Sequence, residues 1–289
     1  MDTENAPAKI NLALAVTGKR DDGYHLIETF VVFTEFGDRL TVEPANADSF
    51  VISGPYGDQL ATPDLRANLV LHARDMLRAR IIADGNSAPA VSLTLEKNLP
   101  VASGIGGGSA DCAATLRLLA RHWNHQLKAS DVTDIGLKLG ADVPMCLRSH
   151  SLMARGIGEV LESWHLAEPL YLVLANPGVA VSTPAVFKLL SCAFNPPLPA
   201  LKNAPDGKSM AKWVQSARND LAAPACSVAP EITSGLNALE RSGAEVVAMS
   251  GSGATCFGLY RDSETAQQAA STLAGNHPDW FIRATRTIG

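Results

Sequence analysis

Residues 100–110, Pro-Val-Ala-Ser-Gly-Ile-Gly-Gly-Gly-Ser-Ala, decide the fold that we expect for this chain. Four of the five residues 104–108 are glycine, an apolar segment precedes the loop at 91–95, and a helical pattern of small and apolar residues follows it. A glycine loop that opens a helix gathers bare backbone N–H groups at the positive end of the helix dipole, which is typical of a phosphate site. The alternative interpretation is a tight turn with close packing.

The loop matches neither of the two common phosphate-binding templates. A dinucleotide-binding fingerprint that began at Gly104 would need a third glycine at position 109, where Ser109 stands. A P-loop would end in Gly-Lys-Ser/Thr, and no lysine follows Gly108. Among phosphate binders, this leaves a kinase whose glycine loop has another design.

Bulk composition excludes several classes of function. The 289 residues suit one large or two moderate domains, and 46% hydrophobic with 18% charged residues is ordinary for a globular protein. A net charge of −5 without a basic stripe argues against a nucleic-acid partner. The acidic, polar start is no secretory signal, and the longest apolar runs are too short to span a bilayer. Five cysteines spaced 30 or more residues apart form no metal or disulfide pattern, so we expect a reduced, cytoplasmic enzyme.

Local patterns predict a mixed α+β fold, because strands and helices alternate irregularly. We expect a first domain over residues 1–160 and a second over 161–289. Strands are predicted at 10–16, 27–36, 39–42, 91–95, 170–175, 245–249 and 254–260, with a turn at 37–38 and a hairpin or crossing at 154–162. Helices are predicted at 68–82, after the glycine loop, and at 130–139, 183–191 and 263–274.

Lys9 and Asn11 lie two residues apart on the first predicted strand. A period of two places both side chains on one face of that strand, opposite Ile10 and Leu12. A lysine and an amide on one face indicate a polar site beside a core strand. The alternative is an exposed face of the sheet.

Asp142 lies at a loop-to-element junction, in the segment Gly140-Ala141-Asp142-Val143-Pro144. A carboxylate there can accept a hydroxyl proton during phosphoryl transfer. It can equally cap a helix that has Pro144 near its start.

Tyr24 and His25 follow a charged turn at 19–22. An aromatic ring beside a histidine suits recognition of a flat ring by stacking and by hydrogen bonds to its edge. The alternative is a surface turn with one anchoring aromatic side chain.

These motifs stand in the same order as in the GHMP kinases, which include galactokinase and the homoserine, mevalonate and phosphomevalonate kinases. The resemblance covers about residues 7–258 and includes a second glycine turn at 249–255, Met-Ser-Gly-Ser-Gly-Ala-Thr. The Gly-Tyr-His segment at 23–25 and the Gly-Ala-Asp-Val-Pro segment are similar to those of members whose acceptor is cytidyl-diphospho-methylerythritol, in the non-mevalonate isoprenoid pathway. The fold implied has an N-terminal nucleotide-binding domain and a C-terminal domain that closes a cleft.

The resemblance implies transfer of the γ-phosphoryl group of ATP to the 2-hydroxyl of that acceptor. Asp142 matches the family's catalytic base and Lys9 the lysine beside it, whose charge would lower the carboxylate pKa. Asn11, Tyr24, His25, Phe187 and, less closely matched, Thr183 would bind the acceptor, with Tyr24 and Phe187 stacked on cytosine and His25 reading its edge. The residues that would bind ATP are Pro100, Val101, Ala102, Ser103, Gly104, Ile105, Gly106, Gly107, Gly108, Ser109 and Ala110 of the loop, with Asn68 and Lys97 near the adenine and ribose.

The loop departs from the family's pattern at its end. The family has Ser-Ser where this chain has Ser109-Ala110, so the second hydroxyl is missing. The motifs contain no second acid for Mg²⁺, so the metal ligands stay unknown and we expect ATP and water to hold most of the ion. The expected partners are ATP and the small acceptor, with no nucleic acid and no membrane, in a monomer or weak homodimer.

Two other functions fit part of this pattern. Another GHMP kinase, for homoserine, mevalonate or a sugar, would not need the aromatic residues around His25, because those acceptors carry no base. A catalytically inactive nucleotide-binding regulator would not need both Lys9 and Asp142. Release of ADP with different acceptors distinguishes the three.

Overall fold

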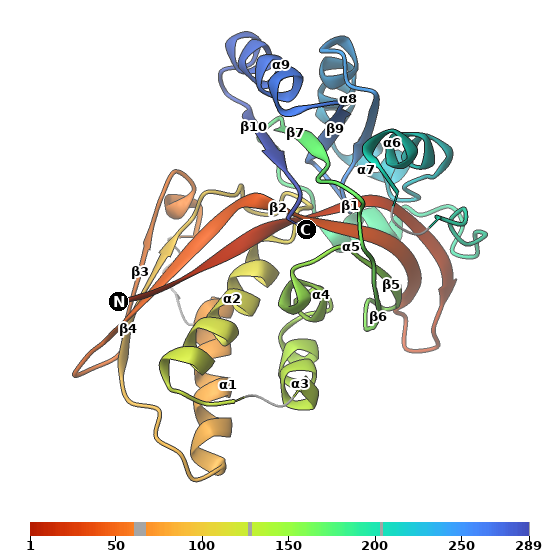
Figure 1. Ribbon diagram of the computed structural model, residues 1–289. Coiled ribbons are helices and arrows are strands. Elements are labelled where there is room, and N and C mark those ends of the chain that lie inside the picture. Colours follow the sequence, from red (N-terminus) through yellow and green to blue (C-terminus); the bar gives the residue numbers. More distant parts are fainter. Residues whose placement is uncertain (61–67, 127–128, 203–204, 289) are drawn as a thin grey trace. The chain divides into compact units, whose positions relative to one another are not determined.

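The computed structural model describes residues 1–60, 68–126, 129–202 and 205–288 (Figure 1). The chain divides into two compact units. The first contains residues 1–8, 37–101 and 106–148, and the second contains residues 9–36, 102–105 and those from 149 onward. The predicted domain division at residue 160 stays a prediction.

Two long strands, β1 (Asp2–Lys19) and β2 (His25–Pro44), contribute residues to both units. The predicted turn at 37–38 is wrong, because β2 runs through it without a break. A Cβ on Gly37 would overlap the backbone carbonyl of Ala6, so glycine serves a close approach of two backbones there. Asp38 is buried and turns its carboxylate inward, which a polar residue at a surface turn would not do.

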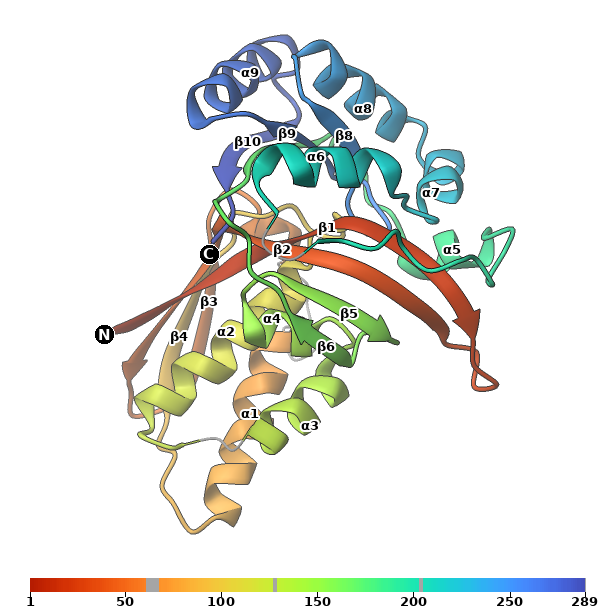
Figure 2. The same cartoon turned by 45° about the vertical axis from the view of Figure 1, so that its right-hand side comes forward.

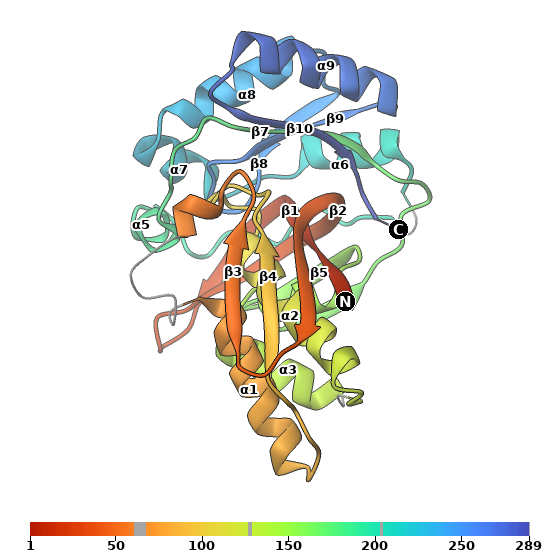
Figure 3. The same ribbon diagram turned by 90° about the vertical axis from the view of Figure 1, so that its left-hand side faces the viewer.

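The first unit packs helices on one face of a small sheet. The end of β2 pairs antiparallel with β4 (Val91–Glu96), and β3 (Ser49–Ser53) pairs parallel with β4. Figure 3 shows the helices α1, α2 and α3 behind these strands. The helices of this unit are η1 (Gly57–Leu60), α1 (Leu69–Ala83), α2 (Gly107–His122), α3 (Ala129–Leu139) and α4 (Val143–Arg148).

The second unit contains a four-stranded antiparallel sheet in the order β10-β7-β9-β8, with α8 and α9 along it (Figure 2). Its strands are β7 (Tyr171–Asn176), β8 (Val246–Met249), β9 (Cys256–Tyr260) and β10 (Phe281–Arg286), and the hairpin of β5 (Leu152–Gly156) and β6 (Val160–Ser163) pairs with the first half of β2. Its helices are α5 (Thr183–Lys188), α6 (Gly207–Ser216), α7 (Ala222–Val228), α8 (Glu231–Arg241) and α9 (Ser263–Asn276).

Local patterns located most of these elements. The 3.6-residue spacing selected five apolar residues of α1, of which Val70, Ala73, Leu77 and Ile81 are buried and Leu69 is half-buried. In β4 the buried positions alternate, as a strand with one face on the core requires. The mixed α+β class is confirmed.

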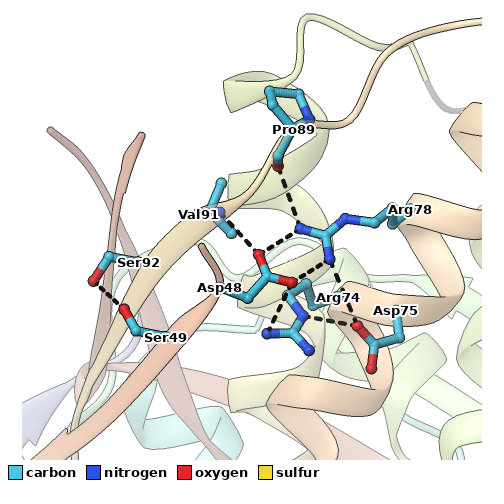
Figure 4. Close-up of polar contacts among 8 residues, drawn as sticks. All are labelled: Asp48, Ser49, Arg74, Asp75, Arg78, Pro89, Val91 and Ser92. Carbon is cyan, nitrogen blue, oxygen red and sulfur yellow. Dashed lines mark hydrogen bonds and ion pairs between the residues drawn. The ribbon is translucent and has the colours of Figure 1, made fainter. Parts of the chain in front are cut away.

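A charged cluster joins the start of β3 to α1 in the first unit (Figure 4). The Asp48 carboxylate accepts hydrogen bonds from the Arg78 guanidinium and, at 2.9 Å, from the backbone N–H of Val91. Arg78 also lies 5.2 Å from the ring centroid of Trp123. These hydrogen bonds, from Arg78 above all, lower the pKa of Asp48 from 3.8 to about 2.

We expect Asp48→Asn to lower the free energy of unfolding by about 1–2 kcal/mol at pH 7, after discounting for the partial exposure of the pair. A carboxylate whose folded-state pKa is depressed stabilises the protein above its unfolded-state pKa. That contribution is lost as the pH falls from about 4 through 2. Urea denaturation at pH 7 and near pH 2 should therefore show a difference between wild type and variant that shrinks in acid.

The matched control is Asp75→Asn. The Asp75 carboxylate also contacts Arg74, at 2.8 Å, but its side chain is 58% exposed. Exposed ion pairs contribute little, so this variant should change stability by less than about 0.5 kcal/mol. Equal effects of the two substitutions would contradict the role given to Asp48.

Candidate active site

The glycine loop leads directly into α2, as the sequence predicts. Gly106 precedes the helix and has a φ of 67°. Because it is a glycine, it has no side chain that could cap the first turn of α2. Ala102 and Gly104 also have positive φ values, of 50° and 77°. Residues 102–105 belong to the second unit, and the loop returns to the first unit at Gly106. A loop with several positive φ values therefore leads into the N-terminus of α2, an arrangement that is typical of anion sites.

The second glycine turn packs against the loop within the second unit. A Cβ on Gly104 would lie 2.6 Å from the carbonyl oxygens of Ser250 and Gly253. The Ser250 hydroxyl donates a hydrogen bond to the Gly104 carbonyl at 3.0 Å, and the N–H of Thr255 donates to the Ser103 carbonyl at 3.0 Å. Close packing therefore accounts for Gly104, and the role of the loop in phosphate binding stays a prediction.

Lys9 and Asn11 are held by the same assembly. The N–H of Lys9 donates to the Ile105 carbonyl at 2.9 Å, and the N–H of Asn11 donates to the Ser250 hydroxyl at 3.1 Å. The two residues are only 4% and 2% exposed, so the alternative of an exposed sheet face is wrong.

Asn11 presents a hydrogen-bond acceptor that the described part of the chain does not use. Its amide nitrogen donates to the Thr29 hydroxyl at 2.8 Å. Its Oδ1 is buried and accepts no hydrogen bond from any described residue. A buried carbonyl oxygen without a donor is costly unless a ligand or water supplies one. A hydroxyl group of a substrate meets that requirement.

His25 and Phe187 are far apart in the sequence but stack on each other. Their ring centroids are 4.8 Å apart at an interplanar angle of 22°. Burial, with a smaller contribution from the charge of Lys19, lowers the pKa of His25, so the imidazole is neutral at pH 7. A neutral imidazole has one donor and one acceptor nitrogen.

Two further residues expected on the acceptor side lie in the same unit. The Tyr24 side chain is 59% exposed. Thr183 begins α5, the helix that carries Phe187, and its hydroxyl lies 2.7 Å from that of Ser252. Neighbouring side chains already order His25, Phe187 and Thr183. A planar ligand that binds here would therefore meet two protein rings and one protein hydroxyl in fixed positions.

Asp142 lies in the first unit, immediately before α4. Its carbonyl accepts a hydrogen bond from the N–H of Cys146 at 3.1 Å, so the backbone begins a helix there as the capping interpretation expects. The segment also lies near the start of α2, since a Cβ on Gly140 would be 4.0 Å from the Ser109 hydroxyl. Capping and general-base roles are compatible at this junction.

Asn68 and Lys97, expected near the nucleoside, differ in environment. The Asn68 side chain accepts a hydrogen bond from the N–H of Val70 at 2.9 Å and caps α1. The Lys97 side chain is buried between the carboxylates of Asp38 and Asp111, both in the first unit. The roles of both residues in ATP binding stay predictions.

Sequence reasoning missed three polar residues that organise these loops. Asp38 and Asp111 hold Lys97, and the Asn219 amide donates to the carbonyls of Met249 and Gly251, both at 2.8 Å. A signal existed for Asp111, which is the one charged residue among the buried residues of α2. Nothing in the local pattern marks Asn219.

The part of the chain that the structure describes contains neither a cluster of metal-binding side chains nor a membrane-spanning helix. No three His, Cys, Asp or Glu side chains there come close enough to hold a metal ion. No described helix has the length and apolar character needed to cross a membrane.

Comparison with known proteins gives a consistent assignment. The family models for the GHMP kinases N terminal domain and GHMP kinases C terminal match residues 68–150 and 197–279. The 4-diphosphocytidyl-2-C-methyl-D-erythritol kinase of Agrobacterium fabrum is 51% identical, over 99% of this chain and 96% of that protein. The enzyme of the same name from Rhizobium etli is 50% identical, over 99% and 95%.

This chain belongs to the 4-diphosphocytidyl-2-C-methyl-D-erythritol kinase family of the GHMP kinases. A crystal structure of a 4-(cytidine 5'-diphospho)-2C-methyl-D-erythritol kinase has a TM-score of 0.81 and 32% identity, with full coverage of both chains. The homoserine kinase of Cytophaga hutchinsonii has a TM-score of 0.71 at 16% identity, over 100% of this chain and 95% of that one, and so shows a shared fold alone. The predicted family is confirmed. Membership of this kinase family also implies that the enzyme uses ATP.

We expect Gly106→Val to raise the KM for ATP by about tenfold or more and to change the KM for the acceptor far less. A β-branched side chain is strained at a positive φ and would displace the amides at the start of α2. Steady-state kinetics with each substrate varied in turn measures the two constants.

Gly275→Ala serves as the control, because a Cβ there meets no atom within 4 Å. It should leave both KM values unchanged. Equal loss of both affinities in Gly106→Val, or loss of its circular dichroism signal, would support the packing-turn interpretation instead.

Proposed function

We propose that this chain transfers the γ-phosphoryl group of ATP to the 2-hydroxyl of 4-diphosphocytidyl-2-C-methyl-D-erythritol. The stacked His25 and Phe187 rings carry this proposal beyond family membership. They supply a flat surface and a neutral hydrogen-bonding ring, which suit a pyrimidine base and are not required by homoserine, mevalonate or a sugar. ADP release measured with each of these acceptors tests the choice.

In this proposal Asp142 accepts the proton of the acceptor hydroxyl as that oxygen attacks the γ-phosphorus. The new O–P bond forms while the bond to the bridging oxygen breaks, and ADP leaves with the electron pair. The Lys9 ammonium would stabilise the negative charge that develops on the attacking oxygen. The unpaired Oδ1 of Asn11 accepts a hydrogen bond from the acceptor.

The backbone amides at the start of α2 would bind the ATP phosphates, with the helix dipole favouring their charge. Mg²⁺ bound to ATP would neutralise part of the charge that develops during transfer. We expect phosphate oxygens and water to hold most of this ion.

Assembly and location stay predictions. We expect a monomer or weak homodimer, which light scattering coupled to size-exclusion chromatography measures directly. We also expect the enzyme to act in the cytoplasm, as its spaced, unpaired cysteines favour a reducing compartment.

We expect Asp142→Asn to lower kcat by about 10²–10⁴-fold, because general-base catalysis contributes that much. The dissociation constant of ATP should stay within about twofold, since the substitution changes neither the loop nor α2. Pre-steady-state phosphoryl transfer and ATP titration separate the two effects.

The companion variants are Lys9→Ala and the double variant. If the two residues act as a unit, the double variant should lose little more activity than Asp142→Asn alone. Near-normal kcat in Asp142→Asn would exclude it as the base.

We expect His25→Ala to relax the preference for cytosine over uracil in the acceptor. A site built around a hydrogen bond to a base edge rejects the wrong base by leaving polar groups unpaired. Loss of a stacking ring should further weaken acceptor binding in Phe187→Ala or Tyr24→Ala by about 1–3 kcal/mol. KM values for the cytidine and uridine forms of the acceptor, at saturating ATP, measure both effects.

His277→Ala is the matched control, because His277 stacks on Trp280 at 3.9 Å in the same way. It should leave the base preference unchanged. Unchanged discrimination in His25→Ala, together with a normal acceptor KM in the Phe187 and Tyr24 variants, would favour a GHMP kinase for a base-free alcohol.

A further inference from the structure

A buried ion cluster joins both ends of the glycine loop in the first unit. The Lys97 ammonium contacts the carboxylates of Asp38, on β2, and Asp111, on α2, the latter at 2.9 Å. The three side chains are 2%, 0% and 4% exposed. A buried lysine that has two carboxylate partners cannot be a solvated surface charge, and removing one partner would leave the others uncompensated.

The cluster fixes the backbone where the chain enters the loop. The second oxygen of Asp38 accepts hydrogen bonds from the N–H groups of Asn98 and Leu99, at 2.5 and 2.8 Å. These residues immediately precede Pro100. Asp38 therefore holds the entry of the loop and the Lys97 ammonium at the same time.

The cluster also fixes the helix that leaves the loop. Asp111 lies in the second turn of α2, and a Cβ on Gly107 would lie only 3.0 Å from the Lys97 Nζ. Glycine at the first position of α2 thus lets the ammonium lie directly against the helix start. Lys97 connects the entry and the exit of the loop through one charged group.

We propose that Lys97 is a positioning residue for the ATP phosphates, which acts through Asp38 and Asp111 on the two ends of the loop rather than by touching the nucleotide. This inference rests on the proposed role of the loop in ATP binding. It differs from the expectation that Lys97 lies near the adenine or ribose, because its ammonium is already engaged by two buried carboxylates.

The charge of the cluster has a consequence for the phosphate site. Asp111 Oδ1 is buried and accepts no hydrogen bond from any described residue. Burial, together with the charge of Asp38, raises the pKa of Asp111 to about 8 against the opposing effect of Lys97. The adjacent Cys112 thiol, whose pKa burial raises to about 12, stays neutral. Asp111 therefore stays protonated to a higher pH than an ordinary carboxyl group, and its ionisation adds negative charge beside the start of α2.

Three variants test the positioning role by titration calorimetry with ATP and with adenosine. Lys97→Met should weaken ATP binding by about tenfold while adenosine binding changes by less than twofold, and the acceptor KM should stay nearly constant. Lys97→Met/Asp111→Asn also removes one of the two carboxyl groups that Lys97→Met leaves without a cation, and it should bind ATP no better than Lys97→Met does. Asp111→Asn alone keeps a side-chain oxygen that can accept from Lys97, and it should weaken ATP binding at pH 7 less than Lys97→Met does.

The pH profile separates positioning from a merely structural role. Wild-type ATP affinity should fall several-fold between pH 7 and pH 9, as Asp111 ionises, and the affinity of Asp111→Asn should not. The proposal would be overturned if ATP affinity changed with pH in the same way in wild type and Asp111→Asn. It would also be overturned if a folded Lys97→Met/Asp111→Asn bound ATP as tightly as the wild type. Equal loss of adenosine and ATP would show direct nucleoside contact instead. If neither Lys97 variant folds, Asp111→Asn decides, because it should weaken ATP binding while leaving adenosine binding unchanged.

Two controls distinguish this inference from the proposed function. Asp48→Asn removes a carboxylate from another charged cluster of the same unit (Figure 4), and should lower stability without changing ATP affinity or its pH dependence. Unchanged ATP affinity in Gly106→Val would exclude the loop as the phosphate site. If ATP binding is weakened in Gly106→Val but unchanged in Lys97→Met/Asp111→Asn, only the role of Lys97 is excluded.

Discussion

The close approach of two glycine turns is the constraint on which the candidate site depends. Gly104 lies so near the carbonyls of Ser250 and Gly253 that no side chain fits between them. The Ser250 hydroxyl then accepts from Asn11 and donates to Gly104, and the N–H of Lys9 donates to Ile105. One packing contact therefore fixes part of the glycine loop and two candidate residues of β1. The Asn219 side-chain amide stabilises the second turn, because it donates hydrogen bonds to two of its carbonyl groups.

Two charged clusters of the first unit show different uses of the same chemistry. Asp48 has fully charged partners and partial solvent access, so its pKa falls and it stabilises the fold. Asp111 is buried with one shared ammonium, so its pKa rises. The difference follows from desolvation, which favours the neutral acid when the available partners are too few. Only the second cluster adjoins the glycine loop.

Local patterns predicted those elements whose signal lies within the element. The spacing of apolar residues located α1, and the glycine cluster located the start of α2. The same reasoning missed β3, β10 and the helices α6, α7 and α8. It also divided β2 at Gly37, because glycine and aspartate favour turns unless a neighbouring backbone and buried donors require them in a strand.

The sequence by itself determined the kind of chemistry: a glycine loop before a helix, a lysine and an amide on one strand face, and an acid at a helix start. These signals are local, because they depend on backbone freedom and on spacing along one element. Only the tertiary structure decided that His25 stacks on Phe187, that Asn11 keeps a buried oxygen unpaired, and that Lys97 turns inward. Those outcomes depend on contacts between residues far apart in the chain, where burial and partner groups, rather than local propensity, set the orientation and charge of each side chain.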